Sequence, residues 1–200
     1  MSEEVRGMDP ISLGTRALRR KGSLRFVTAM PQGEYSVIAT TVTGRFGGVT
    51  LASWDQEEAE WRSDTFIAQF GPAGWTTDGH MSGGYLPGLN DIRIDWPWLS
   101  GPPVREDSRH VGWIETESER LCLCCIGFWC HPSVATIRAQ TSLGEARGVP
   151  SPWRLALILI PCGEEVDMTV KDKDGLVLEE STVYEQPDFG PPSDMRWWES

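Results

Sequence analysis

Side chains able to bind a metal or act as a nucleophile concentrate in residues 121–131, which read Leu-Cys-Leu-Cys-Cys-Ile-Gly-Phe-Trp-Cys-His. In an extended strand, successive side chains point to opposite faces. Cys122 and Cys124 then share one face and Cys125 takes the other, with Cys130 and its neighbouring histidine just past the strand end. The spacing therefore divides the thiols between two surfaces.

A metal site or reactive thiol built on this stretch needs a further residue from elsewhere. Cys124, Cys130 and His131, joined by Cys162 from the next apolar segment, have the thiolate and imidazole groups that zinc takes in tetrahedral sites. The same residues are surrounded by leucine and isoleucine, and free cysteine is among the most buried residue types. These four residues are the candidate metal or thiol site, and inert core cysteines are the alternative.

Enzyme signatures give no support to a catalytic reading of the cluster. The chain has no Gly-x-Ser-x-Gly, His-Glu-x-x-His, phosphate-loop or dinucleotide-binding string. A nucleophilic Cys130 would need His80 or His110, because adjacent side chains on an extended chain diverge. We expect a non-enzymatic protein without a cofactor, and we keep a thiol- or metal-dependent enzyme or sensor using residues 122–131 as an alternative.

Aromatic residues in loops and in the tail are the second group of candidates. Rings beside a long loop at one end of a sheet can stack a sugar, a Pro-rich peptide or a flat apolar ligand. They can equally plug the end of the sheet. The candidate ligand or partner-binding residues are Trp75, Tyr85, Trp96, Trp98, Trp197 and Trp198.

Charge favours a protein partner over nucleic acid. The 200 residues include 18 basic and 29 acidic side chains, a net charge of −11, together with ten tryptophans. Such acidity opposes binding to phosphate or to anionic membranes, except through a basic N-terminal arm containing Arg16, Arg19, Arg20 and Lys21. We expect an interaction module whose acidic, Trp-bearing surface binds a protein partner, possibly basic, in an inhibitor, immunity, adaptor or assembly role. A glycan or small-ligand binder is a further alternative.

Apolar runs and cysteine usage indicate the cellular compartment. The longest apolar runs fall far short of the roughly 20 residues needed to cross a bilayer as a helix. The opening residues do not resemble a secretory signal, and five cysteines crowded in this way suit a reducing compartment. A cytoplasmic location is the expectation.

Strand patterns separated by Gly- and Pro-rich turns run through most of the chain. They predict an all-β fold, an antiparallel β-sandwich or jelly-roll-like structure of about ten strands with at most one or two short helices. The expected domain spans 24–184, between a basic arm at 1–23 and a tail containing proline and tryptophan at 185–200. The predicted strands are 24–30, 35–43, 49–54, 65–70, 91–96, 111–116, 120–128, 133–140 and 153–160.

Five segments carry more specific predictions. Residues 165–181 predict a hairpin turning at Asp174-Gly175, rather than a calcium loop. Residues 153–160, apolar on both faces, predict a central strand covered on both sides. Residues 55–62 are compatible with two turns of helix, and 71–90 predict a long loop. A further short helix is expected at 11–20, where Gly14 weakens it.

Overall fold

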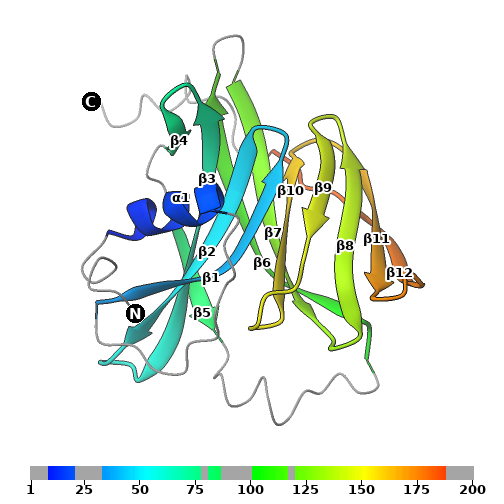
Figure 1. The fold of residues 1–200 in the computed structure, drawn as a ribbon, viewed down its shortest axis with the longest axis horizontal. Coiled ribbons are helices and arrows are strands. Elements are labelled where there is room, and N and C mark those ends of the chain that lie inside the picture. Colours follow the sequence, from blue (N-terminus) through cyan, green and yellow to red (C-terminus); the bar gives the residue numbers. More distant parts are fainter. Residues whose placement is uncertain (1–8, 21–32, 78–80, 87–100, 117–119, 188–200) are drawn as a thin grey trace.

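The computed structural model describes residues 9–20, 33–77, 81–86, 101–116 and 120–187. Within these ranges the chain forms one helix and twelve strands in three antiparallel sheets (Figure 1). The prediction of an all-β, antiparallel sandwich with little helix is confirmed. The molecule has three stacked sheets, which we name A, B and C, and a helix on the outer face of sheet A.

Each sheet is built from strands that are mostly close in sequence. Sheet A contains β1 (Tyr35–Thr43), β2 (Phe46–Asp55), β3 (Glu60–Gly71), β4 (Gly74–Thr76) and β5 (Ser82–Leu86). Sheet B contains β6 (Val104–Glu115), β7 (Arg120–Cys130) and β10 (Leu155–Pro161). Sheet C contains β8 (Val134–Thr141), β9 (Gly144–Gly148), β11 (Val166–Asp172) and β12 (Val177–Val183).

Strands β7 and β10 of sheet B are buried on both faces, which explains their continuous apolar runs. In β7, Leu123, Cys125 and Trp129 pack into the core shared with sheet A. The side chains between them, such as Ile126 and Phe128, pack into the core shared with sheet C. Strand β10 divides its side chains in the same way. A strand covered on both sides has no polar face, so the alternation of polar and apolar residues disappears in β7 and β10.

Strand β10 is covered on both faces, as predicted, but it lies at the hydrogen-bonding edge of sheet B. The order of that sheet is β10-β7-β6, with β7 in the centre. The outer edge of β10 is covered by β1 and β9 (Figure 1). The Thr43 hydroxyl donates to the Leu159 carbonyl at 3.2 Å and so satisfies one carbonyl of that edge. The prediction of a central strand is therefore wrong in pairing and right in burial.

Helix α1 (Pro10–Arg20) packs on the outer face of sheet A (Figure 1). Asp9 caps it, since Asp9 Oδ1 accepts a hydrogen bond from the Ser12 amide at 2.9 Å, and Pro10 follows at the first helical position. Leu18 is buried in a third apolar cluster with Phe66 and other residues of sheet A. Residues 10–20, which include part of the predicted basic arm, therefore pack against sheet A. Within the described residues, no helix is long and apolar enough to cross a membrane.

Residues 55–62 do not form the predicted helix. Strand β2 ends at Asp55, β3 begins at Glu60, and a tight turn joins them. Asp55 Oδ1 accepts from the amides of Glu57 and Glu58 at 2.9 and 3.3 Å, and Ala59 adopts a positive φ of 51°. Side-chain to backbone bonding by Asp55 thus forms a turn and outweighs the helical pattern of the acidic residues.

The predicted loop at 71–90 contains two short strands, β4 and β5, which both pair with β3. The predicted strands at 24–30 and 91–96 lie outside the described residues. The predicted hairpin at 165–181 is confirmed as β11 and β12. Its turn places Gly175 at φ 85°, with Asp172 Oδ1 accepting from two backbone amides.

Replacement of Gly14 by alanine tests whether α1 belongs to the folded body. A Cβ at this position would lie 2.4 Å from Phe66 Cζ and 3.0 Å from Val49 Cγ1, and Phe66 is fully buried. In a helix free of such contacts, Ala is more favourable than Gly by about 1 kcal/mol. Here we expect Gly14→Ala to lower the free energy of unfolding by about 1–3 kcal/mol because of overpacking, as measured by urea denaturation.

A second substitution identifies the cause of that loss. Phe66→Leu makes room for the new Cβ because its side chain is shorter. The double variant Gly14→Ala with Phe66→Leu should therefore lose less free energy of unfolding than the two single variants lose in total. A Gly14→Ala variant more stable than the wild type would contradict the packing of α1.

Candidate functional site

The four residues of the candidate metal or thiol site do not come together. Cys124 and Cys130 share the face of β7 that packs on sheet C. They are six positions apart in the sequence, which corresponds to about 20 Å along the strand. Cys130 is the last residue of β7 rather than a residue beyond it. Cys162 follows β10 at the far end of sheet B, where its amide donates to the Cys122 carbonyl. Among the described residues, no three His, Cys, Asp or Glu side chains are arranged to hold a metal.

Hydrogen bonds from neighbouring residues fix His131 and the main chain around it. His131 Nδ1 lies 2.7 Å from Ser133 Oγ and 3.1 Å from the Ser133 amide, which donates to it. The half-buried Arg154 guanidinium donates to the carbonyls of His131, Cys130 and Val134. Burial lowers the pKa of Arg154. Its hydrogen bonds to carbonyl oxygens fix the turn from β7 to β8, so this cation has a structural role.

The buried thiols are poor nucleophiles. Cys124, Cys125 and Cys130 are at most 2% exposed. Burial raises the pKa of Cys125 and of Cys130 to about 12, and it also raises the pKa of Cys124 well above its ordinary value. Because the thiolate is the nucleophile and the metal ligand, thiols of this kind are inert near neutral pH.

Two of the six candidate aromatic residues lie in the described part of the chain. Trp75, in β4, meets Phe70 edge to face with ring centroids 5.4 Å apart, and it packs on the cluster beneath α1. Tyr85 lies in β5 opposite Arg62 of β3. Trp96, Trp98, Trp197 and Trp198 lie outside the described residues.

A row of three other tryptophans connects the surface to the core between sheets A and B. Trp54 and Trp61 face each other across β2 and β3, with ring centroids 5.4 Å apart and an interplanar angle of 67°. Trp61 and Trp153 follow at 5.7 Å and 80°. Edge-to-face pairs of this kind contribute about 0.5–1.5 kcal/mol each beyond burial. Trp153 is fully buried and Trp54 half-buried, so the tryptophan row is exposed at one end.

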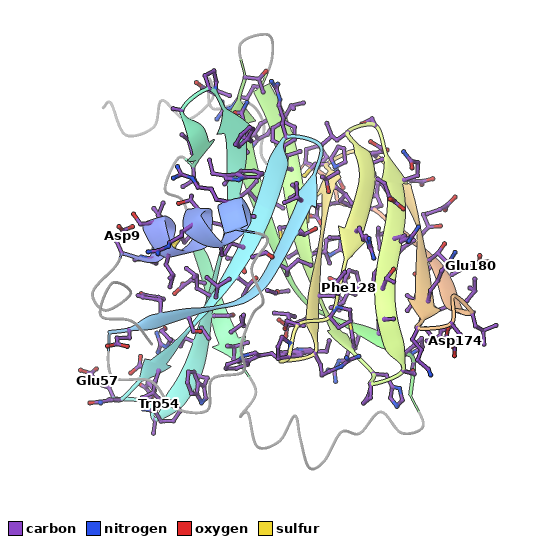
Figure 2. All side chains as sticks on the ribbon, in the orientation of Figure 1. Asp9, Trp54, Glu57, Phe128, Asp174 and Glu180 are labelled. Carbon is purple, nitrogen blue, oxygen red and sulfur yellow. The ribbon has the colours of Figure 1, made fainter. Side chains whose placement is uncertain are left out.

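An acidic turn adjoins the exposed end of the tryptophan row. The turn, residues 55–60, carries Asp55, Glu57, Glu58 and Glu60. Arg62 Nε lies 3.1 Å from Asp55 Oδ2 and 3.4 Å from Glu60 Oε1, so one guanidinium serves two of these carboxylates. Figure 2 shows Trp54 and Glu57 together at the end of sheet A that lies away from sheet C. Trp54 with residues 55–60 therefore forms an acidic surface around an aromatic ring, which we call the acidic tip.

The acidic tip was not among the candidate sites predicted from the sequence. The prediction of a helix over 55–62 separated Trp54 from Trp61, although both flank a polar stretch of six residues. That spacing is the signal for a hairpin, in which the two rings become cross-strand neighbours.

A shallow groove of about 400 Å³ lies between the ends of sheets A and B. The Arg120 guanidinium stacks over the half-buried Trp113 ring, 5.0 Å from its centroid. The groove therefore combines an aromatic face with charged and hydrogen-bonding side chains. Its lining is Gln69, Thr76, Thr77, Trp113, Ile114, Glu115 and Arg120.

Comparisons with known proteins place no constraint on these surfaces. No protein-family model matches the sequence, and no curated protein shows significant similarity to it.

Cysteine alkylation tests the burial of the thiols. Cys122 and Cys162 are partly exposed, whereas Cys124, Cys125 and Cys130 are buried. At pH 8 we therefore expect iodoacetamide to modify the three buried thiols of the native protein at least about tenfold more slowly than the two partly exposed ones. Time-resolved peptide mass spectrometry measures the five rates. In urea, all five should react at similar rates. Rapid native modification of any of the three buried thiols would contradict this assignment.

Proposed function

We propose that the protein is a non-enzymatic interaction module whose acidic tip binds a basic segment of another protein. The observation that carries the proposal is the half-buried Trp54 ring, held by Trp61 and bordered by the acidic turn. Tryptophan is enriched among the residues that dominate binding energy, because its large rigid surface is buried at little entropic cost. Its fixed position beside Trp61 also reduces the ordering required on binding.

Electrostatics supports a basic partner. Glu57 and Glu58 are exposed at the outer end of the acidic tip, and the whole chain has a net charge of −11. Complementary charge at the edge of an interface accelerates association and excludes partners of like charge. A Lys- or Arg-containing segment with an apolar side chain that reaches Trp54 fits both features of this surface.

The location that we propose for this activity is the cytoplasm. Five cysteines, four of them crowded into residues 122–130, suit a reducing compartment. Helix α1 places the Arg19 guanidinium against Gly74 of sheet A, so part of the basic N-terminal segment belongs to the folded body. We therefore propose protein rather than nucleic acid as the main partner.

Charge reversal at the acidic tip tests the proposal. We expect Glu57→Lys with Glu58→Lys to weaken capture of a partner from a lysate of the source cells by at least about tenfold, because the substitution replaces attraction by repulsion. Trp54→Ala should weaken the same interaction without changing its dependence on salt. Quantitative mass spectrometry of the captured proteins at two ionic strengths measures both effects.

The matched control reverses two exposed charges at the opposite side of the molecule. Asp174 and Glu180 lie there in sheet C (Figure 2). Asp174→Lys with Glu180→Lys gives the same change in net charge and should leave capture intact. Equal loss in both double variants, or no protein that depends on Trp54, would overturn the proposal.

A second candidate function is the binding of a small sugar or sugar acid in the groove beside Trp113. The support is the combination of an aromatic ring with Arg120, whose guanidinium can bind a carboxylate, and with polar side chains suited to hydroxyl groups. The groove is within the size range of about 300–1,000 Å³ that small-molecule sites occupy.

Tryptophan fluorescence distinguishes this second function from the first. In titrations with a panel of neutral sugars and sugar acids, we expect quenching in the wild-type protein that disappears in Trp113→Phe and persists in Trp75→Phe. No response across the panel, or an equal response in Trp113→Phe, would remove the groove from consideration and leave the acidic tip unaffected.

A further inference from the structure

Two cysteines face each other across neighbouring strands at one end of sheet B. The register of β7 and β10 pairs Leu123 with Pro161, so Cys122 and Cys162 form the next pair. The Cys162 amide donates to the Cys122 carbonyl at 2.9 Å. Burial raises the pKa of the Cys122 thiol, and the neighbouring Cys162 thiol partly offsets that effect. The two cysteines are therefore cross-strand neighbours.

This arrangement suits a disulfide. Directly opposed residues of a hydrogen-bonded antiparallel pair have Cα atoms about 5.5 Å apart, which is within the disulfide range of about 4.4–6.8 Å. The Cβ atoms of such a pair are slightly farther apart than a disulfide requires. Cys162 lies in a turn past Pro161, the last residue of β10, so a small shift there leaves the paired residues 155–161 in place. The resulting bond is mildly strained and hence readily reduced.

The other cysteines are less suitable partners. Cys124 lies two positions from Cys122 on the same face of β7, so their Cβ atoms are about 6.6 Å apart. A disulfide needs Cβ atoms about 3.8 Å apart. Cys125 points to the opposite face of sheet B, and Cys130 is at its other end. Cys122 and Cys162 are also the two cysteines that are not fully buried, so an oxidant can reach them.

We propose that Cys122 and Cys162 are a redox-reactive pair that hydrogen peroxide converts to a reversible disulfide. In the first step, one thiolate sulfur attacks peroxide, the O–O bond breaks, and a sulfenic acid forms with release of hydroxide. In the second, the partner thiolate attacks the sulfenic sulfur, the S–S bond forms, the S–O bond breaks, and water leaves after protonation of the hydroxyl group. Two thiols are oxidised by two electrons and one peroxide is reduced to two waters.

The pair lies where the chain after sheet C is attached. The Gly163 amide, one residue after Cys162, donates to the Glu185 carbonyl at 2.7 Å. The Arg109 guanidinium holds the same segment, donating to Glu185 Oε2 at 2.5 Å and to the Tyr184 carbonyl at 2.7 Å. Oxidation acts on the turn that holds Glu185, so this modification site is independent of the acidic tip.

Peptide mapping of the full chain tests the pair directly. Trypsin cuts after Arg120, Arg138, Arg154 and Lys171, so Cys162 is in peptide 155–171 and the other four cysteines are in peptide 121–138. After treatment with a few equivalents of hydrogen peroxide and blocking with iodoacetamide, we expect a species that joins these two peptides, with the intact protein about 2 Da lighter before alkylation. Dithiothreitol should restore the separate peptides. Fragmentation of the linked species should locate the bond at Cys122.

Three variants make the result specific. Cys122→Ser and Cys162→Ser should each abolish the linked species, while Cys124→Ser, the matched control on the same strand face, should retain it. Circular dichroism confirms that each variant is folded, and the fragmentation result in the wild-type protein does not depend on them. A bond located at Cys124, Cys125 or Cys130, a bond between two molecules, or oxidation without any linked peptide would overturn the proposal.

Discussion

The structure depends on the burial of two strands of sheet B, β7 and β10, on both faces. Strands β7 and β10 must supply apolar side chains at every position, since alternate residues enter separate cores shared with sheets A and C. Cysteine fits this requirement as a small apolar residue. The contact is close: a Cβ on Gly48 of β2 would lie 2.5 Å from Cys125 Sγ, so sheet A approaches sheet B there only because Gly48 has no side chain.

This constraint explains why most of the cysteines that suggest a metal or thiol site are chemically inert. Most of the cysteines that resemble metal ligands are buried in the two cores. Burial raises the pKa of Cys125 and of Cys130 to about 12. Polar chemistry is left to the ends and turns of the sheets. There, the tryptophan row carries aromatic surface from the buried Trp153 to the acidic tip, and Cys122 meets Cys162 beyond the last paired residues of β7 and β10.

Much of the fold could be predicted from sequence because strand periodicity and turn residues are local signals. The hairpin at 165–181 and the two-face burial of 155–160 follow from them. The hairpin that pairs Trp54 with Trp61 also has a local signal, the spacing of the two rings around a polar stretch, but the acidic residues between them resemble a helical pattern. Local pattern could not show that β10 is an edge strand covered by β1. The pairing of Cys122 with Cys162 depends on register, which is set by contacts distant in sequence.

Residue-resolved hydrogen exchange of the full chain tests the central claim, that the doubly buried strands β7 and β10 of sheet B are the core on which the other elements are built. If so, the amides of 123–129 in β7 and 155–160 in β10 exchange most slowly, by global unfolding alone, and the exposed edge strand β12 exchanges much faster. Protection in β7 and β10 no greater than in β12 would contradict the account.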